Sequence, residues 1–164
     1  MGHYFINDPN LKSNRKQVKY TYLGKEIILN SDNGVFSKDR VDFGTNVLLN
    51  SLEDLSNIKS VLDVGCGIGV IGISLAKKYS HLNVHMVDVN EKAVMLTNEN
   101  IKLNKLDNAK TYISNIYSEV RDAYDLVISN PPIRAGKDVV HGIASGAKDA
   151  ITAMDWVGLV AISI

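Results

Sequence analysis

The chain has 164 residues, of which 45% are hydrophobic and 22% are charged, with 18 basic and 18 acidic side chains. This length suits one domain with one hydrophobic core over residues 1–164, and the composition excludes a disordered or fibrous protein. The zero formal charge excludes the broad positive field of proteins that bind nucleic acid regardless of sequence, so any nucleic-acid substrate must be held by local contacts.

The cysteine content and the lengths of the apolar runs indicate in which cellular compartment the protein is expected. Cys66 is the one cysteine, which excludes an internal disulfide framework and indicates a reducing environment. The first ten residues lack a basic stretch followed by an apolar run, and no apolar run reaches the ~18 residues needed to cross a bilayer. We therefore expect a cytoplasmic protein without membrane contact. The histidines lack metal-ligand spacing, so no metal site is expected.

The N-terminal segment is basic. Its cationic residues are Lys12, Arg15, Lys16, Lys19 and Lys25. Such a cluster either contacts nucleic-acid phosphates or forms a solvated face, and the sequence leaves both interpretations open.

The first predicted elements are a β-hairpin and a helix. Between residues 17 and 30, alternating apolar residues flank a turn at residues 23–25, which predicts the hairpin. From Thr45, a candidate N-cap, apolar residues recur at helical spacing as far as Leu55. Residues 1–44, which include the hairpin, are thus expected to precede a main body formed by residues 45–164.

From residue 60 onward, short apolar strands alternate with amphipathic helices. The predicted strands are residues 60–64, 83–88, 110–114 and 124–129, and the predicted helices are residues 69–79, 91–103 and 138–152. Strands that alternate with helices are joined by right-handed crossovers into a parallel sheet covered on both faces. The predicted fold class is therefore α/β, with a doubly wound, mainly parallel sheet.

The first candidate site follows the strand at residues 60–64. Asp63 and the glycines Gly65, Gly67 and Gly69 stand where this strand turns into the next helix. Glycines permit positive φ and let backbone N–H groups approach a ligand, and parallel sheets bind ligands beyond the carboxyl ends of their strands. Asp88, which ends the next strand, is placed to bind ribose hydroxyls.

Two other interpretations of this loop stay open. Residues 67–72 also fit the dinucleotide fingerprint G-x-G-x-x-G, which would indicate a nicotinamide-dependent oxidoreductase. The first glycine of that match lies two residues later than the end of the strand would suggest. The match also does not account for Asp63, whose charge would repel a pyrophosphate and would suit an α-ammonium group. The second alternative is that the glycines bind no ligand and only form a tight turn between the strand and the helix.

The second candidate site is Asn130-Pro131-Pro132-Ile133, at the end of the strand at residues 124–129. Two consecutive prolines hold Asn130 extended and rigid. The Asn130 side-chain oxygen and the Pro131 carbonyl would both accept hydrogen bonds from a planar amino group, draw its lone pair out of conjugation and stabilise developing positive charge. The alternative is a simple proline-rich turn.

These motifs, in this order, resemble class I methyltransferases that act on exocyclic or amide nitrogens. More narrowly, the chain resembles the small-domain family of the ribosomal RNA small subunit methyltransferase C type, which are guanine-N2 enzymes. The stretches that carry the resemblance are residues 34–37, 41–45, 63–69, Asp88 and residues 130–137. The resemblance extends from the start of the chain to about residue 140 and implies a Rossmann-like fold with S-adenosylmethionine as cofactor.

The resemblance also implies that the segment between the hairpin and residue 45 covers the cofactor, and it implies roles for individual residues. The cofactor would be bound by Phe36, Asp42, Gly44, Thr45, Asp63, Gly65, Cys66, Gly67, Gly69, Asp88, Val89, Asn115 and Asn130. Asn130 would be the catalytic residue, with Pro131 and Pro132 shaping its pocket. Ile133, Arg134 and Lys137 would contact the nucleotide. Asn115 stands where the family usually has an aspartate, and an amide accepts a hydrogen bond from adenine equally well.

The implied reaction is methylation of guanine N2 in 16S ribosomal RNA, with ribosomal RNA or the small ribosomal subunit as substrate. Adenine or a glutamine amide stays open as the acceptor. An aromatic residue after Asn-Pro-Pro would favour those acceptors by stacking, and Ile133 is not aromatic.

The C-terminal part departs from the family pattern. The helix predicted at residues 138–152 contains Gly142 and Gly146, each of which costs ~1 kcal/mol relative to alanine. The apolar run at residues 156–164 would be a fifth strand with an unpaired hydrophobic edge, which favours association with a second chain. An incomplete sheet leaves open a further interpretation, a non-catalytic binding module.

Overall fold

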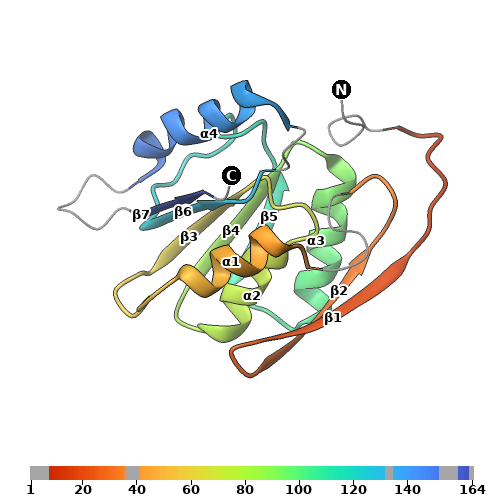
Figure 1. Cartoon of the computed structure of the whole chain (residues 1–164), viewed down its shortest axis with the longest axis horizontal. Helices are drawn as coiled ribbons and strands as arrows, with labels where there is room; N and C mark the ends of the chain where they lie inside the picture. The colour runs from red at the N-terminus through yellow and green to blue at the C-terminus, as the bar shows by residue number, and fades with distance from the viewer. Residues whose placement is uncertain (1–7, 36–40, 132–134, 152–158, 163–164) are drawn as a thin grey trace.

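Five parallel strands form the central sheet: β3 (Ser60–Val64), β4 (Asn83–Asp88), β5 (Ala109–Ile113), β6 (Leu126–Ser129) and β7 (Leu159–Ile162). Their order across the sheet is β5-β4-β3-β6-β7 (Figure 1). The computed structural model describes residues 8–35, 41–131, 135–151 and 159–162. The order reverses between β3 and β6, and in such sheets ligands bind beyond the carboxyl ends of the strands at the point of reversal.

Helices cover both faces of this sheet. Helices α1 (Phe43–Ser51), α2 (Val70–Lys78) and α3 (Glu91–Leu103) contribute to the core on one face, and α4 (Lys137–Ala150) packs on the other. Successive side chains of a strand pack into the cores on opposite faces of the sheet: Val61 belongs to the core beneath α1, α2 and α3, and Leu62 to the core beneath α4. The predicted doubly wound α/β fold is confirmed.

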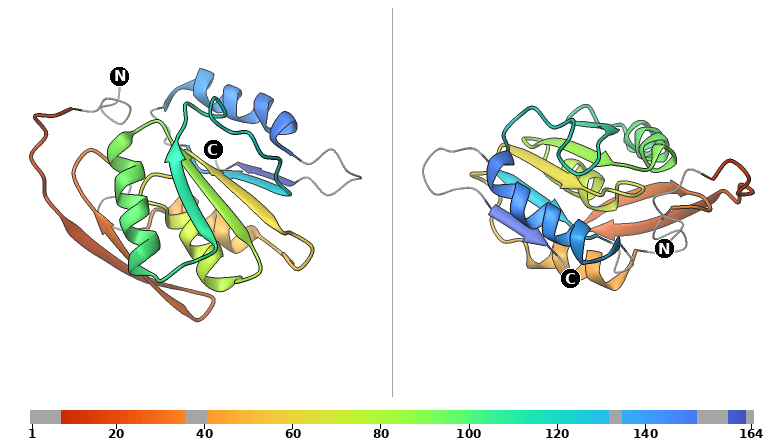
Figure 2. Two further views of the ribbon diagram at one scale, coloured as in Figure 1. Left: turned by 180° about the vertical axis from the view of Figure 1, so that it is seen from behind. Right: turned by 90° about the horizontal axis from the view of Figure 1, so that it is seen from above.

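The N-terminal hairpin is a separate antiparallel pair, β1 (Lys16–Tyr22) and β2 (Lys25–Ser31). Its two-residue turn has positive φ at both Leu23 (45°) and Gly24 (80°), as the twist of a tight hairpin requires. Views from behind and from above show the hairpin beside α3 and away from α4 (Figure 2).

Asn100 of α3 and Asn104, the C-cap of that helix, attach the hairpin to the core. The Asn104 side chain accepts from the Ile28 N–H (3.1 Å) and donates to the Ile28 carbonyl (2.7 Å). Asn100 makes the same pair of bonds with Asn30, at 2.7 and 3.0 Å. Residues four apart on a helix thus pair with residues two apart on a strand, so the outer edge of β2 is satisfied by side chains instead of another strand.

The predicted start and end of the first helix are wrong. The N-cap is Asp42, not Thr45: the Asp42 carboxylate accepts from the Thr45 N–H (3.0 Å) and from the Thr45 hydroxyl (2.9 Å). The helix ends at Ser51, so Leu55 lies in the following connection. Leu55 is nevertheless buried, because it packs into the core from that connection, and this burial is what mimicked helical spacing.

The other predicted elements differ from the structure by at most two residues at either end. The strands at residues 60–64 and 83–88 and the helix at residues 91–103 agree fully. The apolar run at residues 156–164 does contain a fifth strand, because β7 pairs in parallel with β6.

The glycines of α4 serve close packing. A Cβ at Gly146 would lie 2.6 Å from Cδ2 of Tyr117, and one at Gly142 would lie 3.0 Å from Cδ1 of Ile116. The Tyr117 hydroxyl donates to the Ile143 carbonyl of the same helix (2.7 Å). The residues that appeared to interrupt the helix therefore form a flat surface on which the loop after β5 rests.

Candidate active site

The glycine loop joins the carboxyl end of β3 to α2. Gly65, Gly67 and Gly69 all have positive φ (70°, 58° and 90°), a conformation that residues with a side chain rarely adopt. The N–H groups of Gly65 and Cys66 both donate to the Val87 carbonyl of β4, at 2.8 and 3.0 Å. The loop is therefore held across the ends of two strands, and the N–H groups of Gly67 and Gly69 are also paired, with Asp88 and with the Cys66 carbonyl.

Asp63 is buried beneath this loop with one oxygen unsatisfied. Its Oδ2 accepts from the Gly72 N–H (3.1 Å), whereas Oδ1 has no hydrogen-bond partner and is inaccessible to solvent. Burial, together with the charge of Asp88, raises the pKa of Asp63 to about 7. A cationic ligand would supply the missing partner of such a buried carboxyl group, and the contact of Asp63 with an α-ammonium group stays a prediction.

Asp88, at the end of β4, takes part in building the loop. Its carboxylate accepts from the N–H groups of Gly67 and Asn90, both at 2.9 Å. Only 2% of its surface is exposed, yet it lines a cavity. A ribose-binding role for Asp88 stays a prediction, beside the loop-holding role that its hydrogen bonds show.

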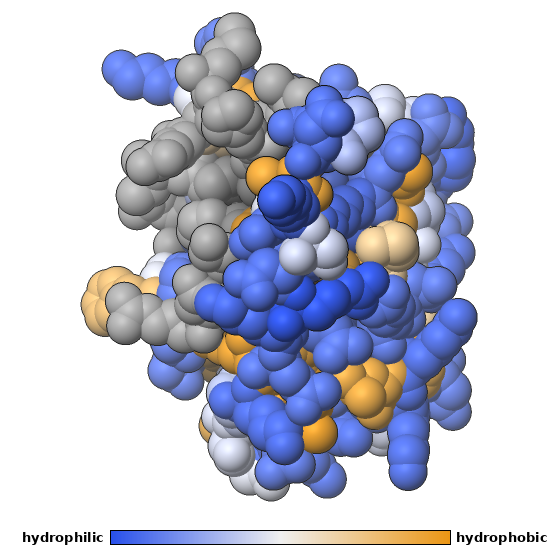
Figure 3. All heavy atoms as spheres, turned by 90° about the vertical axis from the view of Figure 1, so that its right-hand side faces the viewer, coloured by the Kyte–Doolittle hydropathy of each residue, from blue (hydrophilic) through white to orange (hydrophobic). Residues whose placement is uncertain are grey.

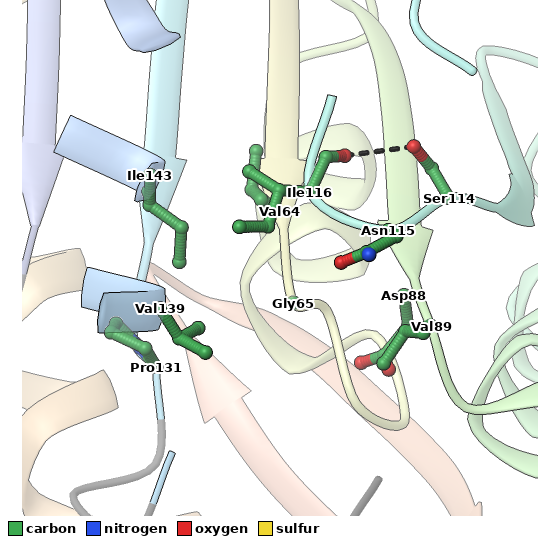
Figure 4. A pocket seen from close by; sticks show the side chains of 10 residues that line it. All are labelled: Val64, Gly65, Asp88, Val89, Ser114, Asn115, Ile116, Pro131, Val139 and Ile143. Carbon is green, nitrogen blue, oxygen red and sulfur yellow. Dashed lines mark hydrogen bonds between the residues drawn. The ribbon is translucent and has the colours of Figure 1, made fainter. Parts of the chain in front are cut away.

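A cavity of about 290 Å³ lies beyond the carboxyl ends of β3, β4 and β6 (Figure 4). Its walls are mainly apolar: Val64 comes from β3, Ile116 from the loop after β5, and Val139 and Ile143 from α4. Polar groups are placed along one side, where Asp88, Ser114 and Asn115 face it. Such a space, apolar with a few directional polar groups, suits a flat heterocycle joined to a sugar.

A second, narrower cavity adjoins the first through Gly65, which lines both. Predicted cofactor residues from three separate segments meet there: Asp42, Thr45, Asp63, Gly65, Cys66, Gly67 and Asn130. The two cavities thus share Gly65 as a lining residue, and the second, of about 20 Å³, is lined by Asp63, whereas the larger one is lined by Asn115.

Asn130 is half-buried at the end of β6, directly beside this junction. The preceding Ser129 is fully buried and donates to the Val64 carbonyl (2.7 Å), so the ends of β6 and β3 are tied together. The Asn130 amide nitrogen donates to the Thr45 hydroxyl oxygen at 2.8 Å. Pro131 is buried and lines the larger cavity.

Several predicted site residues are not brought to these cavities. Gly44 and Gly69 line neither, and Lys137 is exposed as the first residue of α4. Phe36, Pro132, Ile133 and Arg134 lie outside the described residues.

Burial raises the pKa of the Cys66 thiol, and the carboxylates of Asp88 and Asp63 add to this effect, so the thiol is no nucleophile.

The basic N-terminal segment is partly engaged within the fold. Arg15 pairs with Glu99 at 2.6 Å and lies 3.7 Å from Asp32. The hydrogen bond to Glu99 raises the pKa of Arg15. The face that carries the hairpin and α3 is mainly hydrophilic (Figure 3), in keeping with a solvated surface. Phosphate contact therefore stays a prediction for Lys12, Lys16, Lys19 and Lys25.

Sequence reasoning missed the apolar walls of the larger cavity. Val139 and Ile143 are four residues apart in α4, a spacing that marks one helix face and could have identified them. Ser114 and Ile116 follow β5 at the same edge of the sheet as Asp88, so their position in a parallel sheet was the available signal. Within the described ranges, no helix is long and apolar enough to cross a membrane, and no three potential metal ligands cluster.

Comparisons with known proteins agree with this geometry. A family model described as methyltransferase small domain matches residues 26–161 and so extends into β7. The uncharacterized protein YbxB of Bacillus subtilis is 46% identical over 143 residues, which is 86% of this chain and 71% of that protein. Ribosomal RNA small subunit methyltransferase C of Photorhabdus laumondii is 38% identical over 117 residues, which is 71% of this chain but 34% of that enzyme. The chain thus spans about a third of the length of this second relative.

A solved structure shows the same fold. The T. thermophilus 16S rRNA N2 G1207 methyltransferase (RsmC), in complex with AdoMet and guanosine, has a TM-score of 0.76, with 24% identity over 88% of this chain and 41% of that chain. The methyl donor expected from the sequence is thus the ligand present in this structural neighbour. The match to a methyltransferase family model over residues 26–161 argues against the nicotinamide-dependent alternative. The glycine loop, the sheet order and the match over residues 26–161 together show that the chain belongs to the methyltransferase small domain family.

Proposed function

We propose that this chain transfers a methyl group from S-adenosylmethionine to guanine N2 in 16S ribosomal RNA. The observation that carries the proposal is the position of Asn130 and Pro131. Pro131 lines the larger cavity and Asn130 the narrower one, and Gly65 belongs to both, so two acceptor groups stand at the junction of the site. This is where a methyl group would be located if the adenosine and methionine parts of the cofactor fill the two cavities.

The residues present fit this cofactor. The unsatisfied buried oxygen of Asp63 is an acceptor for the α-ammonium group. The apolar walls of the larger cavity fit an adenine ring, with Asn115 as the acceptor for its amine and Asp88 as the partner of the ribose hydroxyls. When bound, S-adenosylmethionine supplies an electrophilic methyl group on a sulfonium.

The chain's own groups then act on the base. The Asn130 side-chain oxygen and the Pro131 carbonyl accept the two hydrogens of the exocyclic amine, which directs its lone pair toward the methyl group. As the nitrogen–carbon bond forms and the sulfur–carbon bond breaks, the same acceptors stabilise the positive charge on nitrogen. The extra proton leaves to solvent afterwards. Positioning and charge stabilisation thus suffice, without a strong base.

The choice of acceptor rests on the relatives. The fold alone accommodates many methyl acceptors, so it does not decide the substrate. A relative named ribosomal RNA small subunit methyltransferase C and a structural neighbour named as a 16S rRNA N2 enzyme support guanine N2. Lys137, exposed at the start of α4, and Arg134 are the proposed phosphate contacts.

Calorimetric titration with S-adenosylmethionine, with NADH in parallel, tests the cofactor. Saturable binding of S-adenosylmethionine alone is the expected result. Methyl transfer is then measured with tritiated S-adenosylmethionine on unmodified 16S rRNA and on small subunits that contain it, and the methylated base is identified by mass spectrometry. Asn130→Ala should abolish transfer, whereas Asn57→Ala, in an exposed turn before β3, should not. Cofactor binding without transfer to either RNA substrate would favour a non-catalytic binding module.

A further inference from the structure

The side-chain amide of Asn130 is held by the first turn of α1. Its Nδ2 lies 2.8 Å from the Thr45 hydroxyl oxygen and 3.2 and 3.4 Å from the two carboxylate oxygens of Asp42. Thr45 is 4% exposed, so this contact is largely shielded from water. Asp42 and Thr45 precede Asn130 by 88 and 85 residues, and only the fold brings them together.

The chemistry of these partners determines which end of the amide faces them. A carboxylate has only acceptor oxygens. The single hydroxyl hydrogen of Thr45 is donated to Asp42 Oδ2 (2.9 Å), so the Thr45 oxygen is also an acceptor toward Asn130. Both partners therefore select the NH₂ end of the amide. The opposite orientation would direct the Asn130 carbonyl oxygen at two other acceptors, which is unfavourable in a shielded site.

The backbone does not impose this orientation. Pro131 restricts the backbone of Asn130, and Ser129 fixes the end of β6, but neither restricts rotation about the last side-chain bond. An amide that is free to rotate would present a donor to the substrate amine in one of its two orientations. Asp42 and Thr45 remove that orientation.

We propose that Asp42 and Thr45 are positioning residues, which hold the Asn130 amide so that its oxygen faces the amine to be methylated. This inference rests on the proposed function, because it assigns the oxygen a substrate. It gives the two residues a role different from the cofactor contact that the resemblance implied. The Asp42 carboxylate also caps α1 by accepting from the Thr45 N–H, so the start of that helix and the orientation of the catalytic amide depend on the same two residues.

Substitutions at Thr45 separate positioning from cofactor binding. Thr45→Val keeps the shape but removes the acceptor, and kcat should fall about tenfold to 100-fold, as expected for the loss of a buried hydrogen bond. The dissociation constant of S-adenosylmethionine should stay within about twofold. Thr45→Ser retains the hydroxyl and should restore kcat to within about threefold. Val47→Thr, on the exposed side of the same helix, is the matched control.

Asp42→Asn tests the second partner without removing the helix cap, since asparagine caps helices as well as aspartate does. Its amide can turn an NH₂ group toward Asn130, so kcat should fall while the melting temperature stays close to that of the wild type. The inference is overturned if Thr45→Val retains wild-type kcat. It is equally overturned if cofactor affinity falls and kcat at saturation does not, because Thr45 would then be a cofactor contact.

A measurement without substrate keeps this result distinct from a failure of the proposed function. In protein labelled with ¹⁵N-asparagine, the Asn130 side-chain NH₂ signal is identified by its loss in Asn130→Ala. Its protons should exchange slowly with solvent in the wild type and rapidly in Thr45→Val. If this difference appears but no RNA is methylated, positioning stands and the proposed acceptor is wrong. If exchange is the same in both proteins, the positioning inference is wrong whatever the RNA assay shows.

Discussion

Replacing Gly146 of α4 by alanine tests how this helix is held beside the site. The added Cβ would lie 2.6 and 2.7 Å from two ring carbons of Tyr117, closer than carbon atoms approach in proteins. The ring is anchored by its hydroxyl bond to the Ile143 carbonyl, so it cannot move away without losing that bond. The substitution therefore sets overpacking against improved helix propensity.

The sizes of these opposing free-energy terms determine whether the substitution stabilises or destabilises the protein. Overpacking costs ~1–3 kcal/mol, and losing the Tyr117 hydrogen bond adds ~1 kcal/mol. Exchanging glycine for alanine within a helix returns ~1 kcal/mol. The free energy of unfolding should thus fall by ~1–3 kcal/mol. Because Ile116 and Ile143 line the larger cavity, the affinity for S-adenosylmethionine should fall as well.

Urea denaturation followed by circular dichroism measures the change. Gly142→Ala is the matched comparison: its Cβ would lie 3.0 Å from the flexible end of Ile116, so its cost should be close to zero. In a Tyr117→Ala background the clash is absent, and Gly146→Ala should stabilise the protein by ~1 kcal/mol. If Gly146→Ala is as stable as the wild type while Tyr117 is present, the packing argument is refuted.

Three further predictions concern buried polar groups. Burial lowers the pKa of His85, so the folded state favours the neutral imidazole. The free energy of unfolding should therefore fall as the pH drops below ~6.5. Denaturation between pH 7.5 and 5 measures this fall, which should be smaller in His85→Gln. With a pKa of about 7, Asp63 must lose a proton to bind an ammonium group. The affinity for S-adenosylmethionine should therefore rise between pH 6 and 7.5. Calorimetry in two buffers should detect the proton released on binding, and this release should be absent in Asp63→Asn. Asn104→Ala should destabilise the protein by ~2–3 kcal/mol because it leaves both backbone groups of Ile28 unpaired, whereas Asn98→Ala, at an exposed position of the same helix, should change stability little.

Features encoded over a few consecutive residues were predictable. The strands at residues 60–64 and 83–88 follow from short apolar runs, and the loop at Gly65 follows from glycines directly after a strand. Because parallel strands place their carboxyl ends at one edge, the proximity of Asp63, Asp88 and Asn130 could be expected before any coordinates. The family resemblance also rested on such local motifs, and the match over residues 26–161 confirms it.

Features that depend on contacts between distant segments were not predictable. The N-cap of α1 was assigned to Thr45, because serine, threonine and aspartate are all good caps and local sequence does not distinguish them. Gly142 and Gly146 were interpreted as weak points of a helix, since the aromatic ring that requires them comes from the loop after β5.

The amino-acid sequence by itself determined the order of strands and helices, the glycine loop and the rigid Asn130-Pro131 turn, because each depends on the backbone preferences and spacing of neighbouring residues. Only the tertiary structure decided that Asp42 and Thr45 hold the amide of Asn130 and that Ile143 faces the cavity. Those contacts join residues far apart in the chain, and their geometry follows from how helices pack on the sheet, which no local pattern specifies.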